Sequence, residues 1–90
     1  MKARKFFYTG SVQGVGFRYS VRQIAAGFDV TGYVRNLPDG RVELFLQGAD
    51  DEVAAMADDV ARSHLNGHIK SVESSDAAVD AQLRGFNILP

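Results

Sequence analysis

The sequence predicts an α+β sandwich, in which two helices pack on one face of an antiparallel sheet with the order βαββαβ and a short fifth strand follows. Three observations lead to this prediction. Several short runs are rich in aromatic and β-branched residues, two longer segments repeat apolar residues with a helical period, and turn-forming residues separate them. Ninety residues, 46% of them hydrophobic, are enough for one core but leave no room for a second domain.

The first strand is predicted over residues 5–9, where "KFFYT" supplies aromatic residues before a loop with three glycines. From Phe17 onward the apolar residues follow a helical period. Those on the predicted buried face are Phe17, Val21, Ile24, Ala25 and Phe28. Gly27 and Asp29 mark the end of this helix, and Asp29 is a candidate for the left-handed conformation that usually falls to glycine.

Two strands of a hairpin are predicted next, "VTGYVRN" over residues 30–36 and "RVELFLQG" over residues 41–48. The turn "LPDG" between them carries proline and an Asp-Gly pair, which are typical of tight turns. In the second strand, the apolar Val42, Leu44 and Leu46 alternate with Glu43, Phe45 and Gln47. This period of two predicts that the first three residues face the core.

The second helix is predicted to begin near Asp50, because three acidic residues suit the positive end of a helix. Its buried stripe consists of Val53, Met56, Ala57 and Val60. Asn66-Gly67 is predicted to end it. A partly exposed strand over residues 68–80 and a short strand with Phe86 and Ile88 complete the fold, while residues 76–85 are compatible with strand, loop or a distorted turn.

Composition limits the classes of function. Ten basic and eleven acidic residues give a net charge of −1, so no global positive field attracts nucleic acid or an anionic membrane. Without cysteine there are no disulfides, thiolate zinc sites or cysteine nucleophiles. The start "MKARKFFYTG" has too few apolar residues for a signal peptide or a membrane span. We therefore predict a cytoplasmic, free-standing chain that begins at Met1, ends at Pro90 and forms a single domain over residues 1–90.

The loop "GSVQGVGFRYS" at residues 10–20 carries the chemistry of an anion site. Gly14 and Gly16 let the backbone curl so that the N–H groups of Val15, Gly16, Phe17 and Arg18 point at one small anion at a helix start. The Arg18 guanidinium matches two phosphate oxygens. The Walker loop and the dinucleotide fingerprint both fit badly, because no Gly-Lys-Ser/Thr ending follows and Tyr19 stands where the third glycine belongs.

"GSVQGVGFR" at residues 10–18 and "TGYVRNLPDGRVE" at residues 31–43 resemble the two signature segments of the acylphosphatase family, and the resemblance extends to "GFNI" at residues 85–88. It implies a ferredoxin-like sandwich that hydrolyses the carboxyl-phosphate anhydride of acyl phosphates to a carboxylate and inorganic phosphate, without metal or cofactor. We also expect the chain to be a monomer. By the family's pattern, Arg18 binds the substrate phosphate and Asn36 positions the attacking water.

Four features depart from the family's pattern. Ser11, Tyr33 and Asp29 stand where a larger or basic residue, a tryptophan and a glycine are common. The tail "NILP" lacks the polar or aromatic ending often seen, which leaves open whether the carboxyl terminus contacts Arg18.

The expected geometry agrees with these roles. With the strand order 4-1-3-2, the first two strands run in the same direction, so the glycine loop and Asn36 lie at the same edge, about 10 Å apart across one strand. A carboxylate leaving group, whose conjugate acid has a pKa of about 4, needs no general acid. This fits a site without histidine.

Alternative interpretations remain open. His64 and His68 have a spacing that can bind metal on a helix, but Asn66-Gly67 lies between them, so we predict no metal site. The same element order builds RNA-recognition domains, and Phe6, Tyr8 and Phe45 would be their stacking residues, although the net charge opposes this. A third possibility is an acylphosphatase-like domain that binds an anion or helps the maturation of a larger enzyme. Arg35 supports either the sheet edge or the acyl side of the substrate.

Overall fold

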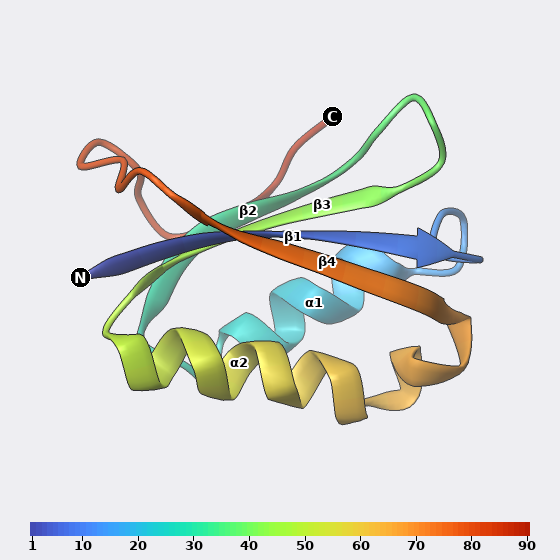
Figure 1. The fold of residues 1–90 in the computed structure, drawn as a ribbon, viewed down its shortest axis with the longest axis horizontal. Helices are drawn as coiled ribbons and strands as arrows, with labels where there is room; N and C mark the ends of the chain where they lie inside the picture. The colour runs from blue at the N-terminus through green and yellow to red at the C-terminus, as the bar shows by residue number, and fades with distance from the viewer.

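The computed structural model describes residues 1–90 and contains one five-stranded sheet with the order β4-β1-β3-β2-β5 (Figure 1). Both α-helices cover the same face of this sheet (Figure 1). The elements are β1 (Lys2–Gly10), α1 (Phe17–Ala25), β2 (Val30–Asn36), β3 (Val42–Gly48), α2 (Asp50–Arg62), the 3-10 helix η1 (His64–His68), β4 (Ile69–Ala77) and β5 (Phe86–Ile88). The predicted element order and the strand order 4-1-3-2 are therefore confirmed.

The sheet is mixed rather than wholly antiparallel. Strand β3 pairs antiparallel with both β1 and β2, and β4 pairs antiparallel with β1. Strand β5, by contrast, runs parallel to β2, with Gly32 opposite Phe86 and Val34 opposite Ile88. A parallel neighbour needs a long connection, and the chain reaches this edge by crossing over from β4 at the other edge.

The hydrophobic core lies between the helices and one face of the sheet. Its side chains alternate along the strands and repeat along the helices with a helical period, as predicted. They include Phe6, Tyr8, Val34, Val42, Leu44 and Leu46 from the sheet and Phe17, Val21, Val53, Met56 and Val60 from the helices. No helix of the structure has the length and apolar character that crossing a membrane requires.

Every residue of β3 is buried, including those that alternate with the core residues. The period of two correctly predicts which side chains face the helices, but the opposite face is covered as well. The ring of Tyr33 stacks on Phe45 with centroids 5.3 Å apart, and Gln47 exchanges two hydrogen bonds of 2.8 Å with the backbone of Asp80. The segment after β4 therefore crosses the far face of the sheet.

The structure corrects two details of the predicted helix ends. Helix α1 ends at Ala25, and Asp29 does not take a left-handed conformation, since all residues with positive φ are glycines. The N–H groups of Gly27 and Phe28 satisfy the last carbonyls of the helix through tight turns, so no left-handed residue is needed.

Helix α2 ends at Arg62, and Asn66 and Gly67 lie inside η1 instead of terminating α2. The reason is Ser63, whose hydroxyl donates to the Val60 carbonyl at 2.8 Å and accepts from the Leu65 N–H at 3.1 Å. Ser63 therefore ends α2 and caps the N-terminus of η1. Strand β4 ends at Ala77, so most of the ambiguous 76–85 stretch is loop.

Candidate active site

The loop over residues 11–16 joins β1 to α1, and two of its glycines have left-handed backbone angles. Gly14 has a φ of +78° and Gly16 a φ of +76°, and the space where a Cβ would stand is open at both. Gly16 is the N-cap of α1, and its carbonyl accepts from the Ser20 N–H at 3.0 Å. The N–H groups of the first turn have no partner within the helix and lie at its positive end. This loop therefore offers backbone donors with little side chain in the way.

A hollow of about 170 Å³ opens between this loop, the start of α1, the end of β2 and β5. It is smaller than the roughly 300–1,000 Å³ of pockets that enclose drug-sized ligands, and it suits one small polar group. Its lining consists of Val12, Gly14, Gly16, Phe17, Arg18, Tyr19, Asn36 and Ile88. The structure thus brings together all the predicted site residues except Val15, which is 41% exposed and does not line the hollow.

Arg18 lies in the first turn of α1 and is half-buried. Its Nη1 donates a hydrogen bond of 3.2 Å to the backbone carbonyl of Leu89. The tail therefore contacts Arg18 through a backbone carbonyl, for which no polar side chain is required. The other guanidinium donors make no hydrogen bond to the protein, and Arg18 lines the hollow.

Asn36 is the last residue of β2 and pairs with Val42 across the hairpin. It lines the hollow, and its Oδ1 is buried without any hydrogen-bond partner. Buried acceptors are almost always satisfied, so this one is available for a molecule that enters the hollow. An amide oxygen accepts a hydrogen bond but does not take a proton at neutral pH.

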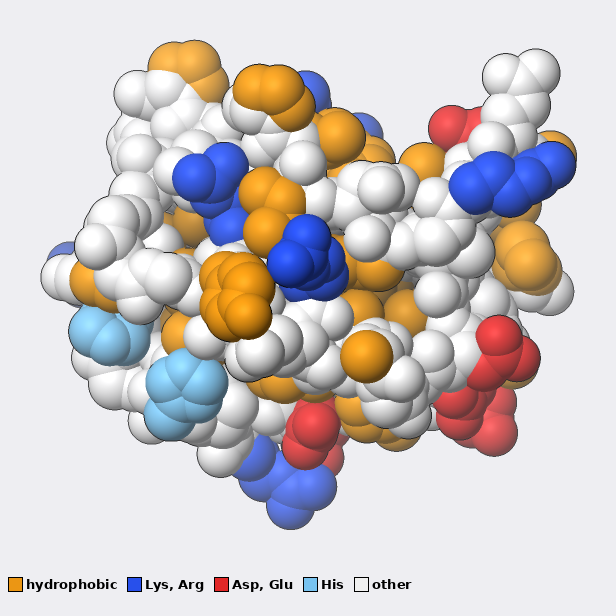
Figure 2. Space-filling model, turned by 180° about the vertical axis from the view of Figure 1, so that it is seen from behind, with side chains coloured by type: hydrophobic (Ala, Val, Ile, Leu, Met, Phe, Trp, Pro, Cys, Tyr) orange, Lys and Arg blue, Asp and Glu red, His pale blue; other side chains and the backbone are white.

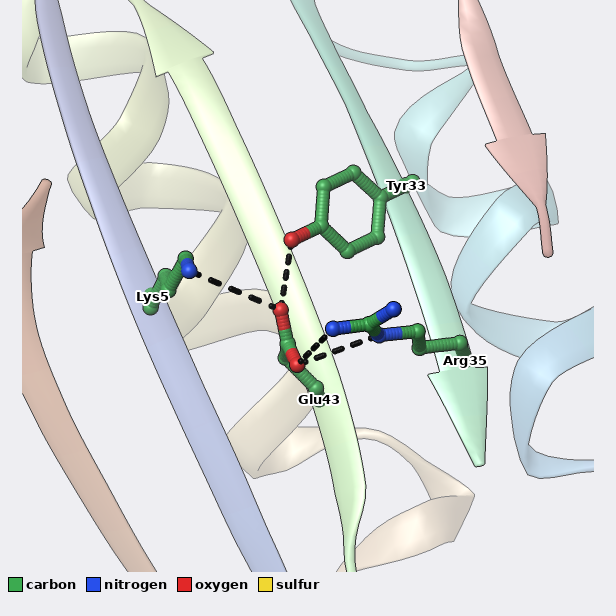
Figure 3. Close-up of polar contacts among 4 residues, drawn as sticks. All are labelled: Lys5, Tyr33, Arg35 and Glu43. Atoms are coloured by element: carbon green, nitrogen blue, oxygen red, sulfur yellow. Dashed lines mark hydrogen bonds and ion pairs between the residues drawn. The ribbon is translucent and has the colours of Figure 1, made fainter. Parts of the chain in front are cut away.

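The structure assigns Arg35 to the sheet and not to the hollow. Side chains alternate along β2, so Arg35 lies on the face opposite to Val34 and Asn36. There its guanidinium donates to Glu43 Oε1 at 3.1 and 3.0 Å, as Figure 3 shows. Arg35 therefore supports the sheet, which is one of the two roles left open by the sequence.

Glu43 is the centre of this far-face cluster, which consists of Lys5, Tyr33, Arg35 and Glu43 (Figure 3). Burial raises the pKa of the Glu43 carboxyl, but hydrogen bonds from Tyr33 and Arg35 and the charges of Arg35 and Lys5 outweigh it and hold the pKa below its ordinary value. Burial and the bond to Glu43 raise the pKa of Tyr33 to about 12. These shifts arise away from the hollow, so they bear on stability.

The two histidines do not reach the hollow. His64 and His68 both lie in η1, and the Nε2 of His64 is 3.1 Å from the Ser20 hydroxyl. The structure gathers no group of three or more His, Cys, Asp or Glu side chains in a metal-binding arrangement. On the face that carries these histidines, the basic side chains near the middle adjoin hydrophobic ones and have no acidic side chain beside them (Figure 2).

The aromatic residues considered for RNA stacking are buried, and this argues against that alternative. Phe6 and Tyr8 face the helices with 7% and 1% of their surface exposed, and Phe45 is 4% exposed under Tyr33. Stacking on a base needs an exposed ring face.

Three features of the site were missed from the sequence. Val12, Tyr19 and Ile88 contribute to the lining, Leu89 contributes its carbonyl, and Gln13 bonds the loop to the β2–β3 turn. The one sequence signal for any of these features was a polar residue, Gln13, among the glycines of the loop. Nothing local in the tail indicates that it approaches α1.

Comparison with known proteins identifies the family. The family model described as Acylphosphatase matches residues 4–88. The chain belongs to the acylphosphatase family. Acylphosphatases are hydrolases that act on acid anhydrides, and their substrates are small acyl phosphates. A curated acylphosphatase of Trichormus variabilis is 46% identical over 86 residues, which cover 91% of this chain and 80% of the relative.

Solved structures of acylphosphatases share the whole fold. The acylphosphatase from Bacillus subtilis superposes with a TM-score of 0.89 at 27% identity, and the match covers 100% of both chains. The structure of HypF from T. kodakarensis contains a similar region, with a TM-score of 0.86 and 30% identity over 100% of this chain but only 12% of that chain. The acylphosphatase fold therefore occurs both as a chain of this size and as part of a much longer one.

Proposed function

We propose that the hollow is the catalytic site at which this acylphosphatase binds and hydrolyses acyl phosphates. The observation that carries the proposal is the convergence, in one hollow of about 170 Å³, of the glycine loop, Arg18 and the unpartnered Oδ1 of Asn36. The N–H groups from Gly14 to Arg18 bind the phosphoryl oxygens, and the Arg18 guanidinium adds a paired donor and a full positive charge.

The reaction follows from these positions. Asn36 Oδ1 accepts a hydrogen bond from a water molecule and holds it in line with the phosphorus. The water oxygen forms the new bond to phosphorus as the bond to the acyl oxygen breaks, and the electron pair leaves with the carboxylate. The water's proton passes to a phosphoryl oxygen, since asparagine is no base. The loop and Arg18 stabilise the charge on the equatorial oxygens.

No general acid is needed, because the carboxylate that leaves has a conjugate acid with a pKa of about 4. We propose that neither metal nor cofactor takes part, since Arg18 and the N-terminus of α1 supply the positive charge. We also propose that residues 1–90 act as one monomeric domain in the cytoplasm, on small molecules and not on nucleic acid. The net charge of −1 supports the exclusion of nucleic acid.

A binding domain is the second candidate, because a similar region forms 12% of the HypF chain. Hydrolysis of benzoyl phosphate, measured with and without EDTA, distinguishes the two. We expect turnover that is unchanged by the chelator and is inhibited competitively by inorganic phosphate. Phosphate binding without turnover would favour the binding domain. Loss of turnover in EDTA would contradict the metal-free mechanism, and purely noncompetitive inhibition would contradict the loop as the phosphate site.

A further inference from the structure

The side chain of Gln13 connects the loop over residues 11–16 to the turn between β2 and β3. Its Nε2 donates hydrogen bonds of 2.9 Å to the Leu37 carbonyl and 3.0 Å to the Arg41 carbonyl. Because both partners are carbonyl oxygens, only the NH₂ end of the amide satisfies them. Both protons of Nε2 therefore bond to the residues at the two ends of the turn, Leu37 and Arg41.

These bonds join the two parts of the hollow. Gln13 lies between Val12 and Gly14, which both line the hollow, and Leu37 directly follows Asn36. The turn itself is closed by the Leu37 N–H, which donates to the Arg41 carbonyl at 2.8 Å. In the structure, the bonds of Gln13 are the hydrogen bonds that link residues 11–16 with residues 36–41.

The arrangement matters because the loop and Asn36 come from strands that are not neighbours. Strand β3 lies between β1 and β2. The pairing of strands in the sheet therefore fixes the distance between the loop and Asn36 only through this third strand. The loop and the turn project at the same end of the sheet (Figure 1). In-line attack is sensitive to placement, and an error of about 1 Å can cost about 10² in rate.

We propose that Gln13 is a positioning residue, which holds the Asn36 side chain at the correct distance from the phosphate bound by the loop and Arg18. This inference rests on the proposed function. Gln13 is itself exposed and outside the core, so its bonds add little packing. Its role is to couple the group that holds the water to the groups that hold the phosphate.

Gln13→Met tests the proposal, since methionine has a similar length and no donor. We expect kcat for benzoyl phosphate to fall about ten- to a hundredfold, while the inhibition constant of inorganic phosphate changes less than about threefold. Gln82→Met is the matched control, because Gln82 is exposed in the loop after β4 and lies outside the hollow. It should leave both constants unchanged.

A double-mutant cycle separates positioning from a general structural role. In the Asn36→Ala background, Gln13→Met should lower the remaining kcat less than about threefold, because the group that it positions is already gone. In ¹⁵N-labelled protein, Gln13→Met should shift or broaden the Asn36 side-chain amide signals, and Gln82→Met should not.

Equal losses of kcat in both backgrounds, or unchanged Asn36 signals, would overturn the positioning role while leaving the proposed function intact. A normal kcat for a folded Gln13→Met would do the same. Failure of the wild-type protein to hydrolyse benzoyl phosphate would overturn the proposed function, and this inference with it.

Discussion

At the scale of single residues, the hollow is unusual in the polar atoms that it leaves unpaired. Arg18 makes one hydrogen bond to the protein, and Asn36 Oδ1 is buried with none. A buried acceptor without a partner costs free energy in the empty protein, commonly about 1–3 kcal/mol. Such a cost is tolerated where a ligand or water removes it, and this agrees with a role for Asn36 in holding the attacking water.

Replacing these two residues should divide their roles. Arg18→Ala should raise KM and lower kcat, because in the proposed mechanism the guanidinium contacts the phosphate in both the ground state and the transition state. Asn36→Ala should lower kcat with little change in KM. Each loss of kcat should reach about 10² to 10³, the usual effect of removing one oriented transition-state group. Steady-state kinetics with benzoyl phosphate, beside circular dichroism, measure both.

Arg84→Ala is the control, because this exposed arginine bonds only to nearby backbone carbonyls. It should leave both constants unchanged. A folded Asn36→Ala with nearly normal kcat would mean that Asn36 serves only the turn and that another group orients the water.

At the scale of elements, the pairing of three strands builds the far-face cluster. Arg35 lies directly opposite Glu43 in the β2–β3 register, and Lys5 reaches Glu43 from β1 at 3.9 Å. The Glu43 side chain is only 4% exposed, whereas those of Lys5 and Arg35 are 39% and 42% exposed. Because the donors lower the pKa of this buried carboxyl, its ionised form is stabilised more in the folded chain than in the unfolded chain.

This cluster should make stability depend on pH. The pKa of Glu43 is lower in the folded protein than its ordinary value of 4.5, so its contribution is present above that value and is lost as the pH falls through the folded pKa. The free energy of unfolding should therefore decrease as the pH falls below about 5. In Glu43→Gln this decrease should be smaller, because the titrating group is gone.

Urea unfolding at several pH values measures the effect, with Glu73→Gln on exposed β4 as the matched control. The control should keep the wild-type slope. Identical slopes for wild type and Glu43→Gln would show that the cluster adds nothing to the pH dependence.

At the scale of the whole molecule, the core and the hollow occupy largely different parts of the sandwich, although Val12 and Phe17 belong to both. The core fills the space between the helices and the middle of the sheet, whereas the hollow lies where the loop after β1, the end of β2 and β5 meet. The final residues close this region, since the Leu89 N–H donates to the Val34 carbonyl at 2.9 Å and the Leu89 carbonyl accepts from Arg18. A core substitution away from the hollow should therefore change the free energy of unfolding more than it changes the activity.

Leu46→Ala tests this separation. Leu46 is fully buried in β3 and pairs with Gly32, away from the hollow. The cavity should cost about 2–5 kcal/mol and lower Tm by at least about 8 °C. The kcat of the protein that remains folded should stay within about twofold of wild type.

Thermal unfolding and kinetics at low temperature measure the two quantities. Val79→Ala, at a position 44% exposed in the loop after β4, should change Tm little. A large loss of kcat in folded Leu46→Ala would instead mean that the core and the hollow are coupled.

The elements and the segments that line the hollow could be predicted from the sequence because they depend on local signals. Periodicity indicated both helices and the core face of β3, "LPDG" indicated the hairpin, and the glycines with Arg18 indicated the loop that lines the hollow. Anion binding by this loop stays a prediction. The helix ends were less predictable. A serine cap at Ser63 and tight turns after Ala25 compete with the glycine and asparagine signals nearby.

The sequence by itself therefore determined the order of the elements, the site segments and the family, whereas the tertiary structure decided how distant segments meet. Only folding brings the Leu89 carbonyl to Arg18, 71 residues away, and Gln13 to Leu37 and Arg41, 24 and 28 residues away. It also sets β5 parallel to β2 and covers the second face of β3. Local propensity acts over a few residues, while these contacts depend on strand order and on where the chain crosses the sheet, which no short pattern encodes.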